Sequence, residues 1–524
     1  MNIWMVAREY AGIAEAGGVK NVTCSISEAL CAQGQKVTLF IPLYGCTDLS
    51  GISNFTCLWH QPVIITVQEK KIHVSFSHGI KNGVDVVFVG HKRFSEKKGV
   101  YTYTKSEELE NPGHRHGCGH EDVQFLNTLF QKAVVAYGST CSDTEKPDVI
   151  HCHDATAAMV PIFLEHYKKN NSYYRSFYDS TKSIITIHNA GSGYHHEYSS
   201  MEEAVFLTGL SQKELERGLN HGCIEPFLLS ADYACMTTVS PEYAKEIVDG
   251  RQDSGGLSFF FKDRNIPLTG ITNGIDYERY NPLNTVVSAL PFAYNPIASD
   301  FLGKYKCRQF FLEKYASHDV KVAGKGITKH GYLAVKDENT VFVTYHGRVV
   351  TQKGIPVLLE AAKILLKENL SVKFIFIGQG EQTLEEKLVK FSLEHKGNAI
   401  YFNGYDKALS RLCIAAADIA VMPSEFEPCG TEDFIAQIFG TIPVAHATGG
   451  LQKIVNTETG FLYDSNTPKI LAGILRSLIT IYLNIGNDAF DTMKAFAASY
   501  IKKEFSWKKV AGQYIELYKG ASTN

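Results

Sequence analysis

Two cations, Arg348 and Lys353, stand between a short apolar segment and a helical pattern. They belong to the segment 347–354, which reads Gly-Arg-Val-Val-Thr-Gln-Lys-Gly. Two positive side chains beside a helix start suit a diphosphate, because an arginine can grip phosphate oxygens with two parallel hydrogen bonds. Two surface cations without a ligand would look the same in a sequence. Taken alone, the segment is compatible with either interpretation.

A carboxylate and a glycine turn follow two later apolar segments. Glu427 lies in the stretch 425–430, Glu-Phe-Glu-Pro-Cys-Gly, just before a helical pattern. Its carboxylate could bind sugar hydroxyls, and the positive end of the helix could face a phosphate. Thr448, Gly449 and Gly450 form a second helix start, where the glycines let backbone amides approach a ligand.

The amino-terminal part of the chain has a similar glycine turn. Glu15, Gly17 and Gly18 follow the first apolar segment and precede a helical pattern. Backbone N–H groups at such a helix start can bind an anion. A tight strand-to-helix turn with no ligand is the alternative, since glycine is the usual turn residue.

Histidines and an aspartate end two further apolar segments. His151, His153 and Asp154 end one of them, and His188 ends the other. The carboxyl ends of strands in α/β sheets face the ligand crevice. The His-x-His spacing suggests a metal, but no third ligand is apparent, which argues against one. Alternation points His151 away from Cys152, so a core position is equally compatible.

Asn273 begins an Asn-Gly pair in the segment 272–276. The dipeptide strongly favours a tight turn, and this is its simplest interpretation.

The elements that must position these residues alternate between strand and helix. Apolar runs predict strands at 3–7, 36–42, 84–89, 148–153, 183–188, 235–239, 340–346, 372–378, 400–403, 419–423 and 441–445. Helical patterns occupy 123–137, 155–167, 354–367, 383–393 and 507–518. This alternation predicts an α/β protein with mostly parallel, doubly wound sheets. The irregular stretch 283–338 suggests a domain boundary near its start.

Composition and net charge argue against several classes of function. The 524 residues carry a net charge of −3, so no basic excess indicates a nucleic-acid or anionic-membrane partner. The twelve cysteines are dispersed without a CxxC pair, which is typical of reduced thiols rather than a disulfide framework. Neither a secretory segment nor an apolar run of membrane-spanning length is evident. We therefore expect a cytoplasmic protein with a small or neutral substrate.

Together these stretches resemble glycosyltransferase family five, the glycogen and starch synthases. The order and spacing match over nearly the whole chain, and the most specific stretches are 427–430, 440–444 and 448–451. The resemblance implies a GT-B fold, in which two Rossmann-like doubly wound domains face each other across a cleft. It places an acceptor-side starch synthase catalytic domain at 1–283, a nucleotide-sugar-binding domain at 284–500, and a helix that returns to the first domain at 501–524.

The resemblance also implies an activity. Members of this family transfer glucose from ADP-glucose to the non-reducing end of an α-1,4-glucan such as glycogen. They retain the anomeric configuration and need no metal or other cofactor.

Residue by residue, the resemblance assigns roles to the matching positions. Arg348 and Lys353 would bind the diphosphate, and Glu427 would bind the donor glucose. His188 would lie beside the transferred sugar, and Asp154 near the sugar and acceptor. The remaining donor-binding positions are Glu15, Gly17, Gly18, Asn273, Thr448, Gly449 and Gly450.

Several positions depart from the family pattern. Glu15 stands where the family has a lysine that touches the phosphate region, so a charge-assisted hydrogen bond of about 1.5–3 kcal/mol would be lost. After the Glu-Pro-Cys-Gly motif the family usually has Leu-Thr-Gln, whereas this sequence has Thr431, Glu432 and Asp433. Further departures are Asn21, Ala155, Thr156 and the segment 190–194.

Three explanations remain open for these departures. In the first, the enzyme is active and other cations replace the missing lysine; Lys20 and Arg8 are near in sequence. In the second, it uses another nucleotide sugar or acceptor. In the third, it is a weak or inactive glucan-binding paralogue.

Overall fold

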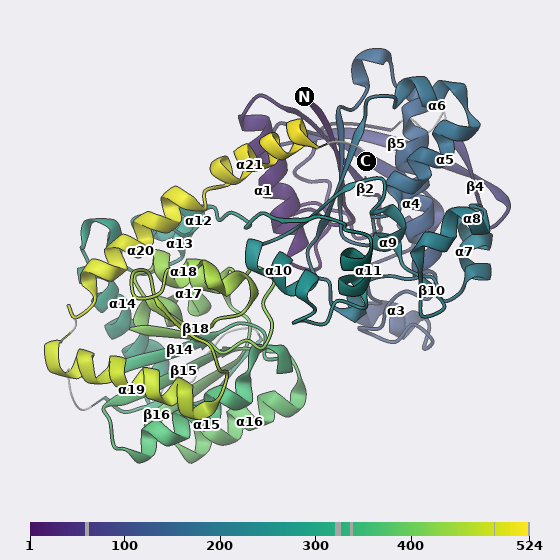
Figure 1. Ribbon diagram of the computed structural model, residues 1–524. Coiled ribbons are helices and arrows are strands. Elements are labelled where there is room, and N and C mark those ends of the chain that lie inside the picture. The colour runs from purple at the N-terminus through teal and green to yellow at the C-terminus, as the bar shows by residue number, and fades with distance from the viewer. Residues whose placement is uncertain (58–61, 320–325, 336–338, 487, 522–524) are drawn as a thin grey trace. The chain divides into compact units, whose positions relative to one another are not determined.

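The computed structural model describes residues 1–57, 62–319, 326–335, 339–486 and 488–521, and they form two compact units (Figure 1). The first unit contains Met1–Asn273 and Trp507–Asn524, and the second contains Gly274–Ser506. The sequence predicts domain boundaries after residues 283 and 500. The structure moves both, because Ile275 and Ile501 pack in a hydrophobic core of the second unit.

The first unit is built on a ten-stranded sheet with the order β12-β11-β8-β7-β1-β2-β6-β5-β3, and β4 pairs with β5. The strand bounds are β1 Asn2–Val6, β2 Lys36–Pro42, β3 Ser53–Cys57, β4 Val63–Val67, β5 Lys70–Lys81, β6 Val84–Gly90, β7 Val149–His153, β8 Lys182–Ile187, β11 Cys235–Thr238 and β12 Leu268–Gly270. The first strand lies in the middle, and the order reverses between β1 and β7. In such sheets ligands bind at this switch point, beyond the carboxyl ends of the strands.

The helices of the first unit include the last helix of the chain. Here α21 (Trp507–Gly520) packs against α1 (Val19–Ala32), as Figure 1 shows. Tyr518 on α21 is buried, and its hydroxyl lies 2.8 Å from Nδ1 of His151 in the middle of β7. The C-terminal helix is therefore part of the core that supports the switch point.

The second unit contains a seven-stranded sheet with the order β13-β16-β15-β14-β17-β18-β19. Its strands are β13 Ile327–Leu333, β14 Val341–His346, β15 Val372–Gly378, β16 Asn398–Gly404, β17 Ile419–Met422, β18 Ile442–His446 and β19 Phe461–Tyr463. All neighbours are parallel except β13, which runs antiparallel to β16. The order reverses between β14 and β17, so a second switch point lies at their carboxyl ends.

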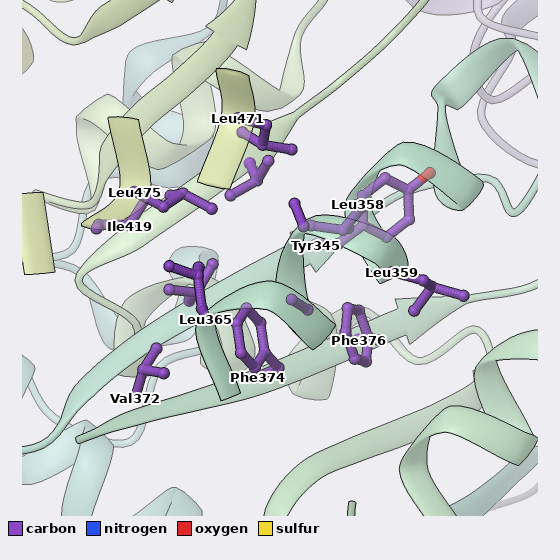
Figure 2. Packing of buried hydrophobic residues seen from close by; sticks show 14 of the residues in the cluster. Tyr345, Leu358, Leu359, Leu365, Val372, Phe374, Phe376, Ile419, Leu471 and Leu475 are labelled. Atoms are coloured by element: carbon purple, nitrogen blue, oxygen red, sulfur yellow. The ribbon is translucent and has the colours of Figure 1, made fainter. Parts of the chain in front are cut away.

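The alternation of side chains along the strands gives the second sheet an apolar core on each face. Along β14, Val343 and Tyr345 belong to one cluster and Phe342 to the other. Along β15, Phe374 and Ile375 divide in the same way. Figure 2 shows the first cluster, which β14 and β15 share with the helices α15 (Ile355–Lys367) and α19 (Pro468–Ile485).

The predicted alternation of strands and helices is confirmed, but three local predictions were wrong. The stretch 283–338 contains α14 (Leu302–Phe311) and β13, and the hairpin strands β3–β5 were missed. These strands pair antiparallel and are partly exposed, so they lack continuous apolar runs. The helix predicted at 155–167 is α5 (Val160–Asn170), since residues 155–159 form turns after Asp154.

Among the described residues, α19 has the length and composition of a membrane-spanning helix, with a mean hydropathy of 1.3 over its 18 residues. The helix also carries Lys469 and Arg476. One side of it, including Leu471 and Leu475, is buried in the core of the second unit (Figure 2). A helix with one buried apolar face and charges elsewhere is typical of a core helix in a globular domain.

This assignment predicts different effects at two positions of α19. Leu475 is fully buried, so Leu475→Ala should lower the free energy of unfolding by about 2–5 kcal/mol, because it leaves a cavity. Ile485 is 66% exposed, and Ile485→Ala should change it by less than about 0.5 kcal/mol. Urea denaturation of both variants provides the measurement. Equal effects would contradict the placement of α19 in the core.

Candidate functional site

In the second unit, three loops with sequence-predicted site residues leave neighbouring strands at one edge of the sheet. They follow β14, β17 and β18, which are adjacent in the sheet. Nζ of Lys353, in the first loop, donates to Oε2 of Glu427, in the second, over 2.5 Å. The N–H of Gly450, in the third, donates to the carbonyl oxygen of Glu427 over 2.8 Å. The structure therefore brings Lys353, Glu427 and the glycine turn together.

Neighbouring carboxylates determine the protonation state of Lys353. Burial alone lowers the pKa of this lysine, but the carboxylates of Glu427 and Glu432 outweigh it and hold the pKa above its ordinary value. The ammonium group is therefore positively charged at neutral pH. Arg348, in the same loop, is exposed and, within the part of the chain that the structure describes, forms no side-chain hydrogen bond or ion pair. Its guanidinium is thus free to bind an anion.

The glycine turn after β18 depends on a close approach between two backbones. A Cβ at Gly450 would lie 2.1 Å from the carbonyl oxygen of Cys429, a distance that no side chain tolerates. Gly449 has a φ of +42°. Thr448 is buried, and its hydroxyl donates to the carbonyl oxygen of Glu425 over 3.4 Å. Glycine is needed here for packing between loops, in addition to any contact with a ligand.

The two unusual acids of this unit both have cationic partners. Although burial raises the pKa of Glu432, the positive charge of Lys353 outweighs it and holds the pKa below its ordinary value. Glu432 therefore shares the field of Lys353 with Glu427. Asp433 is fully buried, and its Oδ1 lies 2.9 Å from Nζ of Lys453.

In the first unit, a carboxylate that the sequence analysis did not select lies at the switch point. Glu9 follows β1 and is 1% exposed. Its Oε2 accepts hydrogen bonds from the N–H groups of Ala16 and Gly17 over 3.0 and 2.6 Å. Burial raises the pKa of Glu9, whereas these two hydrogen bonds act in the opposite direction. The net effect is a raised pKa. The group that occupies these glycine-turn amides is therefore the carboxyl of the protein's own Glu9, and its position shortly after the first strand was the available signal.

Glu15 lies on the exposed side of the same turn. Its carboxylate accepts from the N–H of Gly12 over 2.7 Å and forms an ion pair with Lys20 over 2.8 Å. Arg8 was the other candidate for a compensating cation. It is 1% exposed and donates to Tyr44, Asn127 and the carbonyl oxygen of Val100. Lys20 is thus paired with Glu15, and the Arg8 guanidinium is already held by three groups of the first unit.

Asp154 and His188 lie together at the ends of β7 and β8. The N–H of His188 donates to Oδ1 of Asp154 over 2.7 Å. Burial raises the pKa of Asp154 to about 7, whereas the backbone N–H groups of His188 and Asn189 act in the opposite direction. Asp154 also has a φ of +61°, an uncommon conformation for a residue with a side chain that costs about 1–3 kcal/mol. Such strain is typical of functional sites.

His153 is hydrogen-bonded to His188. Nδ1 of His153 lies 2.8 Å from Nε2 of His188, and its other ring nitrogen lies 2.8 Å from the sulfur of Met5. Burial lowers the pKa of His188 to about 4 and that of His153 well below its ordinary value. Both imidazoles are therefore neutral at pH 7, and one donates to the other.

Of the other two sequence candidates, His151 is a core residue and Asn273 is buried. Nε2 of His151 lies 2.7 Å from the hydroxyl oxygen of Thr186, and the ring is fully buried. Asn273 is 6% exposed, and its Oδ1 has no hydrogen-bond partner within the described residues. No group of three or more His, Cys, Asp or Glu side chains that could hold a metal is found in the described ranges.

The neutral state of His188 predicts a specific pH dependence. Below pH 6.5 the unfolded chain protonates this histidine, whereas the folded chain does so only near pH 4, so His188 lowers stability as the pH falls through this range. Compared with the wild type, His188→Asn should lose about 2 kcal/mol less unfolding free energy between about pH 7.5 and about pH 5.

Urea denaturation at the two pH values provides the measurement. The exposed residue His73 offers the control, since His73→Asn should keep the wild-type pH dependence. Comparing variants also removes the contribution of Asp154, whose raised pKa acts with the opposite sign. An unchanged pH dependence in His188→Asn would show that this histidine is protonated in the folded chain.

Comparison with known proteins gives matches over both units. Residues 2–262 match the family described as "Starch synthase catalytic domain", and residues 334–487 match "Glycosyl transferases group 1". A glycogen synthase of Thermodesulfovibrio yellowstonii is 30% identical, over 99% of this chain and 98% of the relative. A glycogen synthase of Aliivibrio fischeri strain MJ11 is 26% identical over the same shares.

Solved structures show the same fold. The catalytic domain of starch synthase IV from Arabidopsis thaliana, bound to ADP and acarbose, has a TM-score of 0.78 and 24% identity, covering 99% of this chain and 98% of its own. A sucrose-phosphate synthase from Thermosynechococcus elongatus has a TM-score of 0.55 and 14% identity over the same shares.

Proposed function

Because the chain belongs to the glycogen and starch synthase family of GT-B glycosyltransferases, we propose that it is a cytoplasmic enzyme that transfers glucose from ADP-glucose to the non-reducing end of an α-1,4-glucan such as glycogen. One observation carries this proposal. A cation suited to a diphosphate, Lys353, touches a carboxylate suited to a hexose, Glu427, at the switch point of the second unit.

In this proposal the second unit binds the donor. Arg348 and Lys353 stabilise the negative charge that develops on the departing ADP, which is the largest charge change of the reaction. Glu427 accepts hydrogen bonds from the hydroxyls of the donor glucose, and Thr448, Gly449 and Gly450 supply the turn beside the phosphate. Because the ammonium of Lys353 is already paired with Glu427, donor binding has to divide its hydrogen bonds between carboxylate and phosphate.

In this proposal the first unit binds the transferred sugar and the acceptor. His188 lies beside the sugar, and Asp154 binds sugar or acceptor hydroxyls. Because the Glu9 carboxylate already holds the N–H group of Gly17, the glycine turn contributes to this site through Glu9, which can accept hydrogen bonds from sugar hydroxyls. Asn273, whose buried side-chain oxygen is unsatisfied, contributes to the nucleotide site.

The proposed chemistry retains the anomeric configuration. The bond between C1 of glucose and the phosphate oxygen breaks, and the acceptor hydroxyl forms a new bond to C1 on the same face. The leaving phosphate takes the proton of that hydroxyl, so no separate base is required. Exclusion of water favours transfer over hydrolysis.

Adenine is the preferred base in this proposal. The Arabidopsis relative of similar fold is bound to ADP and to acarbose, which supports an adenine nucleotide together with an oligosaccharide. A second candidate function is glucan binding without efficient transfer. The acidic glycine turn favours it, because Glu9 and Glu15 both repel a diphosphate.

A donor panel distinguishes these functions. We expect the purified chain to release ADP from ADP-glucose in the presence of glycogen, and to release UDP from UDP-glucose more slowly. Nucleoside diphosphate release and incorporation of labelled glucose provide the measurements. Glycogen binding without transfer from either donor would establish the glucan-binding alternative.

Arg348→Ala should lower kcat/KM for ADP-glucose by about 10- to 100-fold, because a charge-assisted contact to the diphosphate is worth about 1.5–3 kcal/mol. Lys363→Ala is a matched control, since this lysine is a partly exposed cation that pairs with Glu360 on the neighbouring helix α15. Steady-state kinetics with glycogen in excess test both variants. Wild-type kinetics in Arg348→Ala would exclude this residue from donor binding.

Glu15→Lys tests the departure in the glycine turn. Since Glu15 is exposed and its ion pair with Lys20 lies at the surface, the substitution should leave the free energy of unfolding within about 0.5 kcal/mol. It should lower KM for ADP-glucose, because a repulsive charge becomes attractive. An unchanged KM would show that this turn lies outside the reach of the phosphates.

A further inference from the structure

A buried lysine in the second unit holds together the two loops that the proposed donor site uses. Nζ of Lys453 donates to the carbonyl oxygens of Cys429, Gly430 and Gly450 over 2.6, 3.1 and 3.0 Å. Cys429 and Gly430 follow Glu427 in the loop after β17, whereas Gly450 belongs to the turn after β18. The ammonium group therefore ties these two loops to each other.

Asp433 supplies the negative charge that lets this lysine be buried. Its Oδ1 lies 2.9 Å from Nζ of Lys453, and the two side chains are 0% and 6% exposed. The ammonium also lies 4.5 Å from the ring centroid of Phe434. A charge at this depth is tolerated only when it is paired and its hydrogens are satisfied. The three carbonyls and the carboxylate meet both requirements.

The loops held in this way carry the groups proposed to bind the donor. The carbonyl oxygen of Glu427 accepts a hydrogen bond from the N–H of Gly450. Two residues after Glu427, the carbonyl oxygen of Cys429 accepts from Lys453. A small shift of either loop would move the Glu427 carboxylate relative to the glycine turn. Misplacement of about 1 Å in such a site can cost about 100-fold in rate.

Asp433 itself is enclosed by protein, which separates its role from that of Glu427. It lies in the first turn of α18 (Glu432–Ile438), and its Oδ2 also lies within 3.4 Å of Nε2 of Gln437 on the same helix. Glu427, by contrast, lies beside Lys353 at the switch point. Asp433 can therefore act on a ligand only through the loops that Lys453 holds.

We infer that Lys453 and Asp433 are a positioning pair, which sets the distance between Glu427 and the Thr448–Gly450 turn and thereby the affinity for the nucleotide sugar. The inference rests on the proposed function in one respect, namely that these loops bind the donor. It also gives a physical role to Asp433, the acid that departs from the family pattern.

Lys453→Met removes the ammonium and keeps most of the side-chain volume. We expect KM for ADP-glucose and the dissociation constant for ADP to rise about 10- to 100-fold, while KM for glycogen stays within about twofold. The variant should also lose stability, because Asp433 is left as a buried, unpaired carboxylate. Lys469→Met, which removes an exposed lysine on α19, is the matched control and should resemble the wild type.

The double variant Lys453→Met with Asp433→Leu separates positioning from stability. It leaves no unpaired buried charge, so the urea midpoint should recover toward the wild-type value. The carbonyls of the two loops stay without their ammonium donor, so the donor KM and the ADP dissociation constant should remain high. Recovery of both stability and ADP affinity would overturn the inference, as would a single variant that loses stability alone.

Calorimetry of ADP binding distinguishes a failure of this inference from a failure of the proposed function. If the wild type binds ADP but transfers no glucose, the proposed function falls and the positioning pair is judged by ADP affinity in the variants. If the wild type binds no ADP, both proposals are overturned.

Discussion

The ion pair between Lys353 and Glu427 is the interaction on which the candidate site depends. It joins two loops that leave neighbouring parallel strands at the point where the strand order reverses, which is where α/β sheets bind their ligands. Neither charge is tolerable at this depth without the other. The pair therefore keeps a cation and a carboxylate ready beside each other, and a sugar nucleotide offers a diphosphate to the first and hydroxyl groups to the second.

The other acidic residues of the site also have cations near them. Each acid that departs from the family pattern near the glycine turns has a cationic partner: Glu15 pairs with Lys20, Asp433 pairs with Lys453, and Glu432 lies in the field of Lys353. The departures therefore alter the local charge without leaving a buried charge unbalanced. Compensation preserves the fold, but it leaves Lys353 with two carboxylates in its field, which weakens its attraction for a phosphate.

In the first unit, the candidate site contains neutral histidines and a residue with a strained backbone. Three histidines follow one another in the core beside β7 and β8, and burial keeps their rings neutral. Asp154 holds a left-handed backbone conformation while accepting the N–H of His188. His153, Asp154 and His188 are preorganised by the sheet, since they lie at the carboxyl ends of β7 and β8 or directly after them.

The sequence by itself determined the alternation of strands and helices, the two doubly wound sheets and the residues that match the family, because each of these is encoded in short runs of neighbouring residues. Tertiary structure alone decided that Glu9 occupies the amides of Ala16 and Gly17, that Arg8 is buried, that Tyr518 of the last helix meets His151, and that Lys453 joins two loops. The partners in these contacts come from separate elements or from opposite sides of a turn. Local periodicity reports which face of an element is buried, but not which distant group it meets there.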